Sequence, residues 1–221
     1  MTTSRGSIVL TGFGPFPGVD SNATSDLILE LTEAARTRFA GHEVIGEVLP
    51  VDWRQAPKAL KRLLAGAGAV LALHFGVSDG AKGFQIELVG RNLRGARPDA
   101  SGELPNGDTV IATGPAMLAS TLPAERILTR LTRGGYPCCT SNDAGNYLCN
   151  ALMYHSLAAA RVQQTPFMSG FVHVPASLQR WNCPPGEAAA GHVGNCALTW
   201  TAAVAGSIEI IAACLERATL L

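Results

Sequence analysis

The sequence predicts an α/β fold, in which helices on both faces of a twisted, largely parallel sheet form a three-layer α/β/α sandwich. Apolar strand-like runs alternate with helix-like stretches along the chain, which is the pattern of successive βα units. One run, residues 69–75, is apolar on both faces, as a central strand covered by helices on each side would be. The chain shows no internal repeat and no linker long enough to divide it. We therefore expect residues 1–221 to form a single domain.

Each element follows from its own local pattern. The first strand, 8–11, leads into a glycine- and proline-rich loop at 12–18, and a helix capped near Ser21 to Thr24 comes next. Further strands are expected at 44–51, 69–75, 84–89, 136–140 and 167–174. Further helices are expected at 53–64, 123–131, 144–161 and 196–217. The segments 92–108 and 182–194 are rich in loop-forming residues, and we expect a long surface excursion and a loop there.

Composition and charge exclude several classes of protein. Hydrophobic residues make up 47% of the chain and charged residues 15%, so a large apolar core is expected. Lysine plus arginine equals aspartate plus glutamate at 17 each, which leaves no basic face for nucleic acid or an anionic membrane. Residues 1–6 do not resemble a signal peptide, and no uncharged apolar run approaches the roughly 18 residues of a membrane span. Six cysteines without a disulfide-type spacing suit a reducing compartment, so we expect a cytoplasmic protein.

One cysteine and one histidine have surroundings that suit catalysis. Cys149 follows a turn with capping side chains at 141–143, and the N–H groups and positive dipole end of a helix start stabilise a thiolate. The same N–H groups suit the oxyanion that forms when a carbonyl is attacked. His173 lies 24 residues later in the apolar run 171–175, where it is a candidate base for the thiol proton. The alternatives are a structural cysteine and a core histidine bonded to the backbone.

An acidic residue, Glu87, occupies an otherwise apolar strand. A carboxylate in such a strand is costly unless it is paired, so a specific hydrogen-bond donor is expected. As the third member of a triad, it would orient the imidazole of His173 and stabilise its charged form. The alternative is a residue on the outward face of the strand. Spacing alone does not show that the acid, the histidine and the cysteine meet.

Other chemistry-bearing residues suggest no further site. Cys183, His192 and Cys196 are of residue types that bind zinc, but no fourth ligand is apparent and the spacing matches no common structural site, so we expect no metal. The loop at 12–18 lacks the Gly-Lys-Ser/Thr ending of a phosphate-binding loop. His74, at the end of a central strand, is expected to be a satisfied core residue. No cofactor is therefore expected.

Four motif blocks occur in order between residues 8 and about 180. They are Thr11-Gly12-Phe13-x-Pro15-Phe16; Glu87 with Asn92 and Arg97-Pro98-Asp99; Ser141-Asn142-x-Ala144-Gly145-x-Tyr147-Leu148-Cys149-Asn150; and Phe171-Val172-His173-Val174-Pro175. With Tyr154, these blocks resemble the pyroglutamyl peptidase type I family of cysteine peptidases, also called pyrrolidone carboxyl peptidases. The family's fold is an α/β/α sandwich. Its substrates are peptides blocked by an N-terminal pyroglutamate, and its bacterial members commonly form tetramers, which makes a homo-oligomer possible for this chain too.

The resemblance also assigns roles to individual residues. It implies that Cys149 is the nucleophile that forms a thioester acyl-enzyme, that His173 is the general base, and that Glu87 orients the imidazole. It further implies that a lactam ring is sandwiched by Phe13 and Phe16. Arg97 would help to line the oxyanion region.

The chain departs from the family's usual pattern around the expected ring pocket. Gly14 replaces an acidic residue, and Pro17-Gly18 replaces a pair of glycines. The segment Asn22-Ala23-Thr24-Ser25 stands where Asn-Pro-Ser is usual, and Glu87-Leu88-Val89-Gly90 where Glu-Arg-Val-Ala is usual. No triad residue is lost. Two alternatives therefore stay open: a related amide or lactam hydrolase with an altered acyl pocket, and a non-catalytic binding protein of the same fold.

Overall fold

A computed structural model describes residues 5–16, 22–66, 68–163, 166–180 and 198–218. The helices are α1 (Ala23–Arg38), α2 (Gln55–Gly66), α3 (Ala124–Arg133), α4 (Leu148–Val162) and α5 (Trp200–Ala218). The strands are β1 (Ser7–Phe13), β2 (Glu43–Leu49), β3 (Ala69–Ser78), β4 (Phe84–Glu87), β5 (Val89–Arg91), β6 (Met117–Ala119), β7 (Cys138–Ser141) and β8 (Met168–Pro175). The predicted loop 182–194 and the predicted helix start at residue 196 lie outside the described residues.

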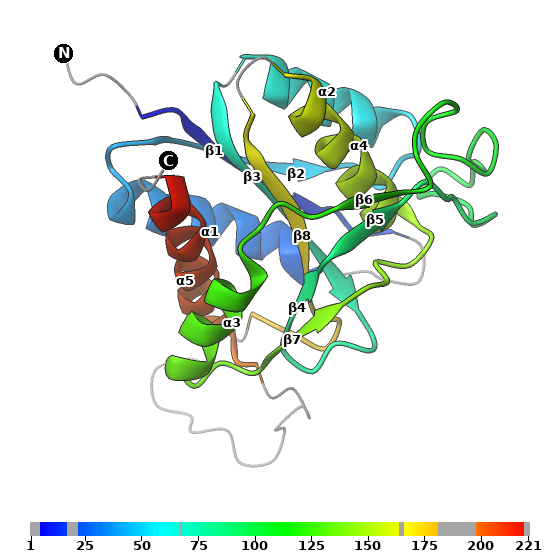
Figure 1. The fold of residues 1–221 in the computed structure, drawn as a ribbon. Coiled ribbons are helices and arrows are strands. Elements are labelled where there is room, and N and C mark those ends of the chain that lie inside the picture. The colour runs from blue at the N-terminus through cyan, green and yellow to red at the C-terminus, as the bar shows by residue number, and fades with distance from the viewer. Residues whose placement is uncertain (1–4, 17–21, 67, 164–165, 181–197, 219–221) are drawn as a thin grey trace, which may run out of the picture.

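Six strands form one mixed sheet in the order β2-β1-β3-β8-β4-β7 (Figure 1). Strands β2, β1, β3 and β8 are parallel to one another. Strand β4 runs antiparallel to β8 and parallel to β7, so the last two strands of the sheet are reversed. The predicted largely parallel sheet is confirmed, and its reversed pair is an addition that the βα alternation did not predict.

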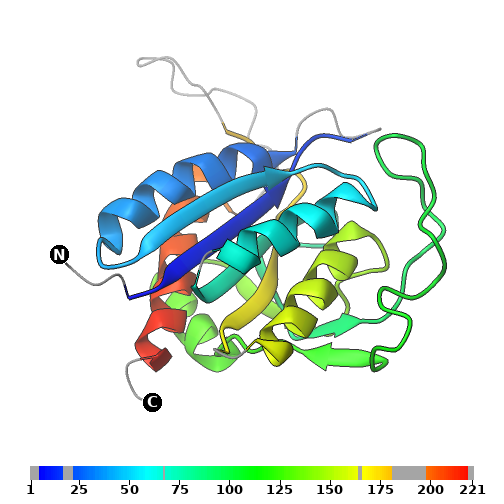
Figure 2. The ribbon, with the colours of Figure 1, turned by 90° about the horizontal axis from the view of Figure 1, so that it is seen from above.

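Helices cover both faces of this sheet (Figures 1 and 2). On one face, α1, α3 and α5 pack over an apolar cluster that includes Ile8, Leu10, Phe75 and Val172. On the other face, α2 and α4 pack over a second cluster that includes Val9, Phe13 and Phe171. Successive residues of β1, and likewise of β8, belong to different clusters, because successive side chains of a strand point to opposite faces of the sheet. The predicted three-layer α/β/α sandwich is confirmed.

Two predicted elements differ clearly from the observed ones. The strand expected at 84–89 ends at Glu87, and β5 pairs antiparallel with β6 in a separate two-stranded sheet that was not predicted. The helix expected from residue 144 begins at Leu148. The predicted surface excursion after β5 is irregular, and it forms the long loops at the edge of the molecule in Figure 2. No helix within the described ranges is long and apolar enough to cross a membrane.

Candidate active site

The candidate site is a cavity of about 410 Å³ at the start of α4. The predicted residues that line it are Cys149, His173, Phe13, Phe16 and Arg97. Glu87 lies behind His173, fully buried and hydrogen-bonded to it. The structure thus brings all six predicted site residues together from the end of β1, the end of β4, the excursion after β5, the start of α4 and β8.

His173 and Glu87 form a buried pair across two antiparallel strands. His173 lies opposite Gln85 in the ladder, and strand alternation puts Glu87 on the same face of the sheet. Nδ1 of His173 lies 2.8 Å from Oε1 of Glu87. The amide of Gln85 donates to the same carboxylate oxygen at 2.8 Å. The other ring nitrogen of His173, Nε2, therefore remains for a partner in the cavity.

The charged form of His173 is stabilised at this position. Burial alone would lower the pKa of His173, but hydrogen bonds with Cys149 and Glu87, and their negative charges, raise it to about 9. Burial would in turn raise the pKa of Glu87, whereas hydrogen bonds from His173 and Gln85 lower it below its usual value. Both shifts favour, at neutral pH, an imidazolium held against the Glu87 carboxylate.

Cys149 is the second residue of α4, where the backbone N–H groups of the first turn have no partner within the helix. The N-cap, Tyr147, has an extended backbone and makes no side-chain cap bond. The prediction that residues 141–143 cap this helix is wrong, because the carboxylate of Asp143 accepts the N–H of Gly145 at 3.0 Å and shapes the preceding turn. The N–H groups and the positive end of the helix dipole are therefore available to an anion at the cavity.

Gly76, which sequence reasoning missed, makes room for the thiol. It lies on β3 directly opposite His173 on β8. A Cβ atom at this position would lie 2.9 Å from Sγ of Cys149 and 2.8 Å from the ring of Phe171, closer than real Cβ atoms approach other groups. The absence of a side chain at Gly76 is thus what lets the thiol sit against the sheet beside the imidazole.

The two phenylalanines lie at the end of β1 and in the loop after it, and this segment is anchored to the start of α1. Oγ1 of Thr24 accepts the backbone N–H of Phe13 at 3.0 Å, and the hydroxyl of Ser25 donates to the Phe13 carbonyl at 2.9 Å. Phe13 is buried, and Phe16 is half-buried against the same apolar cluster. The residues that replace the family's Asn-Pro-Ser therefore hold this loop in place. The departure at 17–18 lies outside the described residues.

Arg97 is held at the cavity wall by its neighbours. Its Cζ lies 4.7 Å from the centre of the Tyr147 ring, which places the guanidinium over the aromatic face. The Tyr147 hydroxyl donates to the Pro98 carbonyl at 2.9 Å, and the indole N–H of Trp53 donates to the Arg97 carbonyl at 3.0 Å. The buried carboxylate of Asp99 accepts the backbone N–H of Trp53 at 3.0 Å. These bonds fix the start of the excursion, and with it a positive charge beside the cavity.

Two polar residues support the site in ways that the sequence argument did not identify. Gln85 holds the buried acid, and strand periodicity, which puts it on the same face two residues earlier, was an available signal. Asn150, which directly follows the cysteine, is fully buried. Its amide donates to the carbonyls of Arg91 and Leu93 at 2.9 Å each and accepts the N–H of Arg91 at 2.8 Å. These bonds fasten α4 to β5 across 59 positions of sequence, and no local pattern predicts them.

His74 takes no part in the cavity. Its ring nitrogens lie 2.8 Å from the hydroxyls of Thr11 and Ser156, and the side chain is fully buried. Burial lowers the pKa of His74 to about 3, so the ring is neutral and the predicted core role is confirmed. Within the described ranges, no group of histidine, cysteine and acidic side chains could hold a metal ion. The three residues considered for zinc, Cys183, His192 and Cys196, lie outside those ranges.

Sequence comparison finds relatives of this chain in archaea and bacteria. A family model described as pyroglutamyl peptidase matches residues 6–213. A pyrrolidone-carboxylate peptidase from Pyrococcus furiosus is 35% identical over 169 residues, which cover 76% of this chain and 80% of the relative. One from Oceanobacillus iheyensis is 34% identical over 170 residues, which cover 77% of this chain and 84% of the relative.

Structure comparison finds the same kind of protein. A crystal structure of pyrrolidone carboxyl peptidase from Pyrococcus furiosus superimposes with a TM-score of 0.80 at 28% identity. The match covers 96% of this chain and 99% of that one. The resemblance drawn from the four motif blocks is therefore confirmed by both sequence and fold.

Proposed function

Because the chain belongs to the pyroglutamyl peptidase family and is therefore a cysteine peptidase, we propose that Cys149, His173 and Glu87 are its catalytic triad. The observation that carries this proposal is the hydrogen-bonded chain from the buried carboxylate through the imidazole to the thiol, at the wall of a cavity. A nucleophile, a base within hydrogen-bond reach, and a third group that orients the base form the arrangement that covalent catalysis requires.

The first half of the proposed reaction forms the acyl-enzyme. The thiolate of Cys149 attacks the carbonyl carbon of the N-terminal residue, and the carbonyl oxygen becomes an oxyanion. The N–H groups at the start of α4 stabilise that oxyanion, and the positive charge of Arg97 at the cavity wall assists. When the intermediate collapses, the imidazolium of His173 protonates the leaving amine and a thioester remains on the sulfur.

The second half releases the acid. Neutral His173 accepts a proton from water, and the resulting hydroxide attacks the thioester carbonyl. The C–S bond breaks, the sulfur leaves as thiolate, and the imidazolium is regenerated beside it. Glu87 stays ionised throughout, because its hydrogen bonds lower its pKa, and it stabilises the imidazolium that forms in both halves.

We also propose that the acyl group is pyroglutamyl. Phe13 and Phe16 supply apolar walls for a flat lactam ring, and the buried acid next to the cavity is already bonded to His173. The other acids that line the cavity, Asp79 and Asp143, are exposed. No buried carboxylate among the described lining residues is left to pair with a free ammonium, which suits an uncharged, blocked N-terminus.

Release of a fluorescent amine tests this function directly. The pyroglutamyl amide should be cleaved at least ~10²-fold faster, in kcat/KM, than the prolyl amide, which lacks the ring carbonyl and carries a charged nitrogen. The unblocked glutaminyl amide should be equally poor. Cleavage of the prolyl or glutaminyl amide as fast as the pyroglutamyl amide would point to the altered acyl pocket instead. No cleavage of any amide would favour a binding protein.

Glu87→Gln is expected to change the pH dependence of this reaction. The wild-type kcat/KM should fall as pH rises past about 9, where His173 loses the proton it gives to the leaving amine. Removing the carboxylate removes one cause of the raised pKa, so this alkaline limb should move to lower pH. At neutral pH the rate should fall by ~10²-fold or more. A pH profile of kcat/KM measures both effects. Glu125→Gln, an exposed acid on α3, is the control, and an alkaline limb that shifts equally in both variants would contradict the role of Glu87.

Gly76→Ala is expected to displace the nucleophile. The added methyl group would press on Sγ of Cys149 and on the Phe171 ring, and a displacement of about 1 Å can cost ~10²-fold in rate. The matched control is Gly80→Ala, where a Cβ would meet only the Ser78 hydroxyl at 3.8 Å. Activity is measured together with thermal unfolding, since overpacking also costs about 1–3 kcal/mol of stability. Equal activity of the two folded variants would show that Gly76 does not position the thiol.

We also propose that the protein assembles into a homo-oligomer, with a tetramer as the expected form, and that it is cytoplasmic. The support for the first is membership of the family, whose bacterial members commonly associate in this way. The support for the second is that Cys138, Cys139, Cys149 and Cys214 are free thiols, as a reducing compartment would keep them. Light scattering of the purified protein measures the first property.

A further inference from the structure

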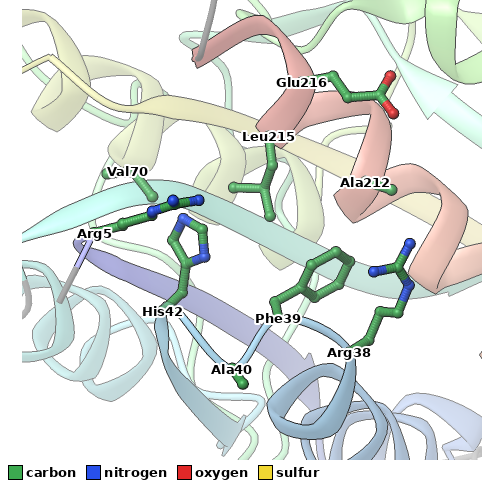
Figure 3. Close-up of a pocket in the computed structure, with 10 residues that line it drawn as sticks. Arg5, Arg38, Phe39, Ala40, His42, Val70, Ala212, Leu215 and Glu216 are labelled. Carbon is green, nitrogen blue, oxygen red and sulfur yellow. The ribbon is translucent and has the colours of Figure 1, made fainter. Parts of the chain in front are cut away.

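A second cavity, of about 690 Å³, lies at the other end of the sheet from the candidate active site (Figure 3). Arg5 and His42 precede β1 and β2, Phe39 caps the end of α1, and Leu215 comes from the last turns of α5. Because β1 and β2 are parallel, their starts lie together, while Phe13 and the nucleophile lie at their far ends. The proposed peptidase reaction makes no use of this cavity.

Positive charge and apolar surface are combined in its lining. Figure 3 shows Arg5 and His42 on one side, Arg38 on the other, and the side chains of Phe39 and Leu215 between them. Cζ of Arg38 lies 5.6 Å from the centre of the Phe39 ring. The arrangement offers a cation at each end of an apolar floor.

The two guanidinium groups of this cavity have no acidic partner among the described residues. Neither Arg5 nor Arg38 forms an ion pair within the described residues. The one acid in the lining, Glu216, is paired with Arg130 of α3. The ends of α1 and α5 each contribute roughly half a negative charge, but this charge is spread over backbone carbonyls and forms no ion pair with either guanidinium. Burial, and then the charge of Arg5, lower the pKa of His42, so the imidazole is neutral at neutral pH and can hydrogen-bond without adding charge.

We propose that this cavity binds a small organic anion that joins a carboxylate to an aliphatic or aromatic body. Either Arg5 or Arg38, at the two ends of the cavity, would hold the carboxylate, since one guanidinium matches its two oxygens with paired N–H donors. Phe39, Val70, Ala212 and Leu215 would cover the apolar body. The volume lies in the range of about 300–1,000 Å³ found for small-molecule sites. An uncharged apolar molecule would leave both guanidinium groups without a partner, so the charge selects the anion.

The probe for this proposal is 4-phenylbutyrate. Its binding is measured by calorimetry and by the change in the NMR signals of the His42 ring. A ligand of this size is expected to bind with a Kd on the order of 1 mM. Its neutral isostere, 4-phenylbutyramide, should bind at least ~10-fold more weakly because it lacks the charge. The His42 signals should shift on binding, while those of buried His74 should not.

Variants locate the binding and separate it from catalysis. Arg5→Gln combined with Arg38→Gln should weaken 4-phenylbutyrate at least ~10-fold, while Arg133→Gln, an exposed arginine at the end of α3, should not change it. The double variant should keep its peptidase activity, and protein alkylated at Cys149 should bind the probe as before. Three results would each overturn the proposal. They are equal affinity of the protein for the acid and the amide, equal affinity of the double arginine variant and the Arg133 variant for the acid, and loss of binding on alkylation of Cys149. Failure of the peptidase assay would leave these binding results unaffected.

Discussion

Replacing Cys149 with alanine is expected to abolish cleavage of a pyroglutamyl amide, with kcat/KM lower by ~10⁴-fold or more. Alanine leaves His173 and the N–H groups of α4 in place but removes the atom that forms the thioester. Cys149→Ser should be nearly as inactive, because a hydroxyl is a far weaker acid than a thiol and His173 cannot hold it as an anion. Amine release under single-turnover conditions gives the remaining rate, and circular dichroism confirms that each variant is folded.

The control for this prediction is another cysteine. Cys139 is exposed on the edge strand β7, and Cys139→Ala should retain wild-type activity. Alkylation with iodoacetamide should inactivate wild-type protein and the Cys139 variant at the same rate, in step with modification of Cys149. A Cys149 variant that keeps a rate near that of wild type would rule out the thioester mechanism. Inactivation that follows modification of Cys139 would do the same.

The local elements of this fold were predictable because their causes are local. The helix α1 begins within the range 21–24 where a cap was expected, and the N-cap is Asn22, whose side chain accepts the N–H of Thr24 at 3.1 Å. The strand that begins at Ala69 is buried on both faces, as its unbroken apolar run indicated. The direction of β4 and β7 was not predictable in this way. A short connection leads from β3 to β4, but β8, from much later in the chain, lies between them in the sheet, and β7 then adds to β4. Neither β4 nor β7 carries this arrangement in its residue pattern.

The site shows the same division between local and non-local causes. Cys149 at a helix start and Glu87 in an apolar strand each have a local explanation, and the ordered motif blocks link them. Gly76 does not, because an ordinary glycine in a strand acquires meaning only when α4 brings a sulfur atom against it. The capping prediction failed for a similar reason. Asp143 is a good N-cap residue type, but its carboxylate binds Gly145 before the helix begins, and Tyr147 occupies the N-cap position instead.

His173→Ala is expected to lower kcat/KM by ~10³-fold or more at neutral pH. The variant loses both the partner that holds the proton of Cys149 and the acid that protonates the leaving amine. It also leaves the buried carboxylate of Glu87 without its imidazolium, so some loss of stability is expected. His173→Gln keeps a polar group near Glu87 and serves as the second variant if the alanine variant folds poorly. The measurement is amine release, with thermal unfolding recorded for each variant.

The double variant distinguishes a catalytic pair from two residues that each support the structure. If Cys149 and His173 act as one unit, the variant lacking both should be no slower than the variant lacking the cysteine alone, because a base without a nucleophile has nothing to activate. If each residue matters only through packing, the two losses should multiply instead, as they do for independent effects. The test compares the rate of the double variant with that of the cysteine variant. If removing His173 slows the cysteine variant by the same factor as it slows the wild type, the proposed transfer of the thiol proton to His173 is excluded.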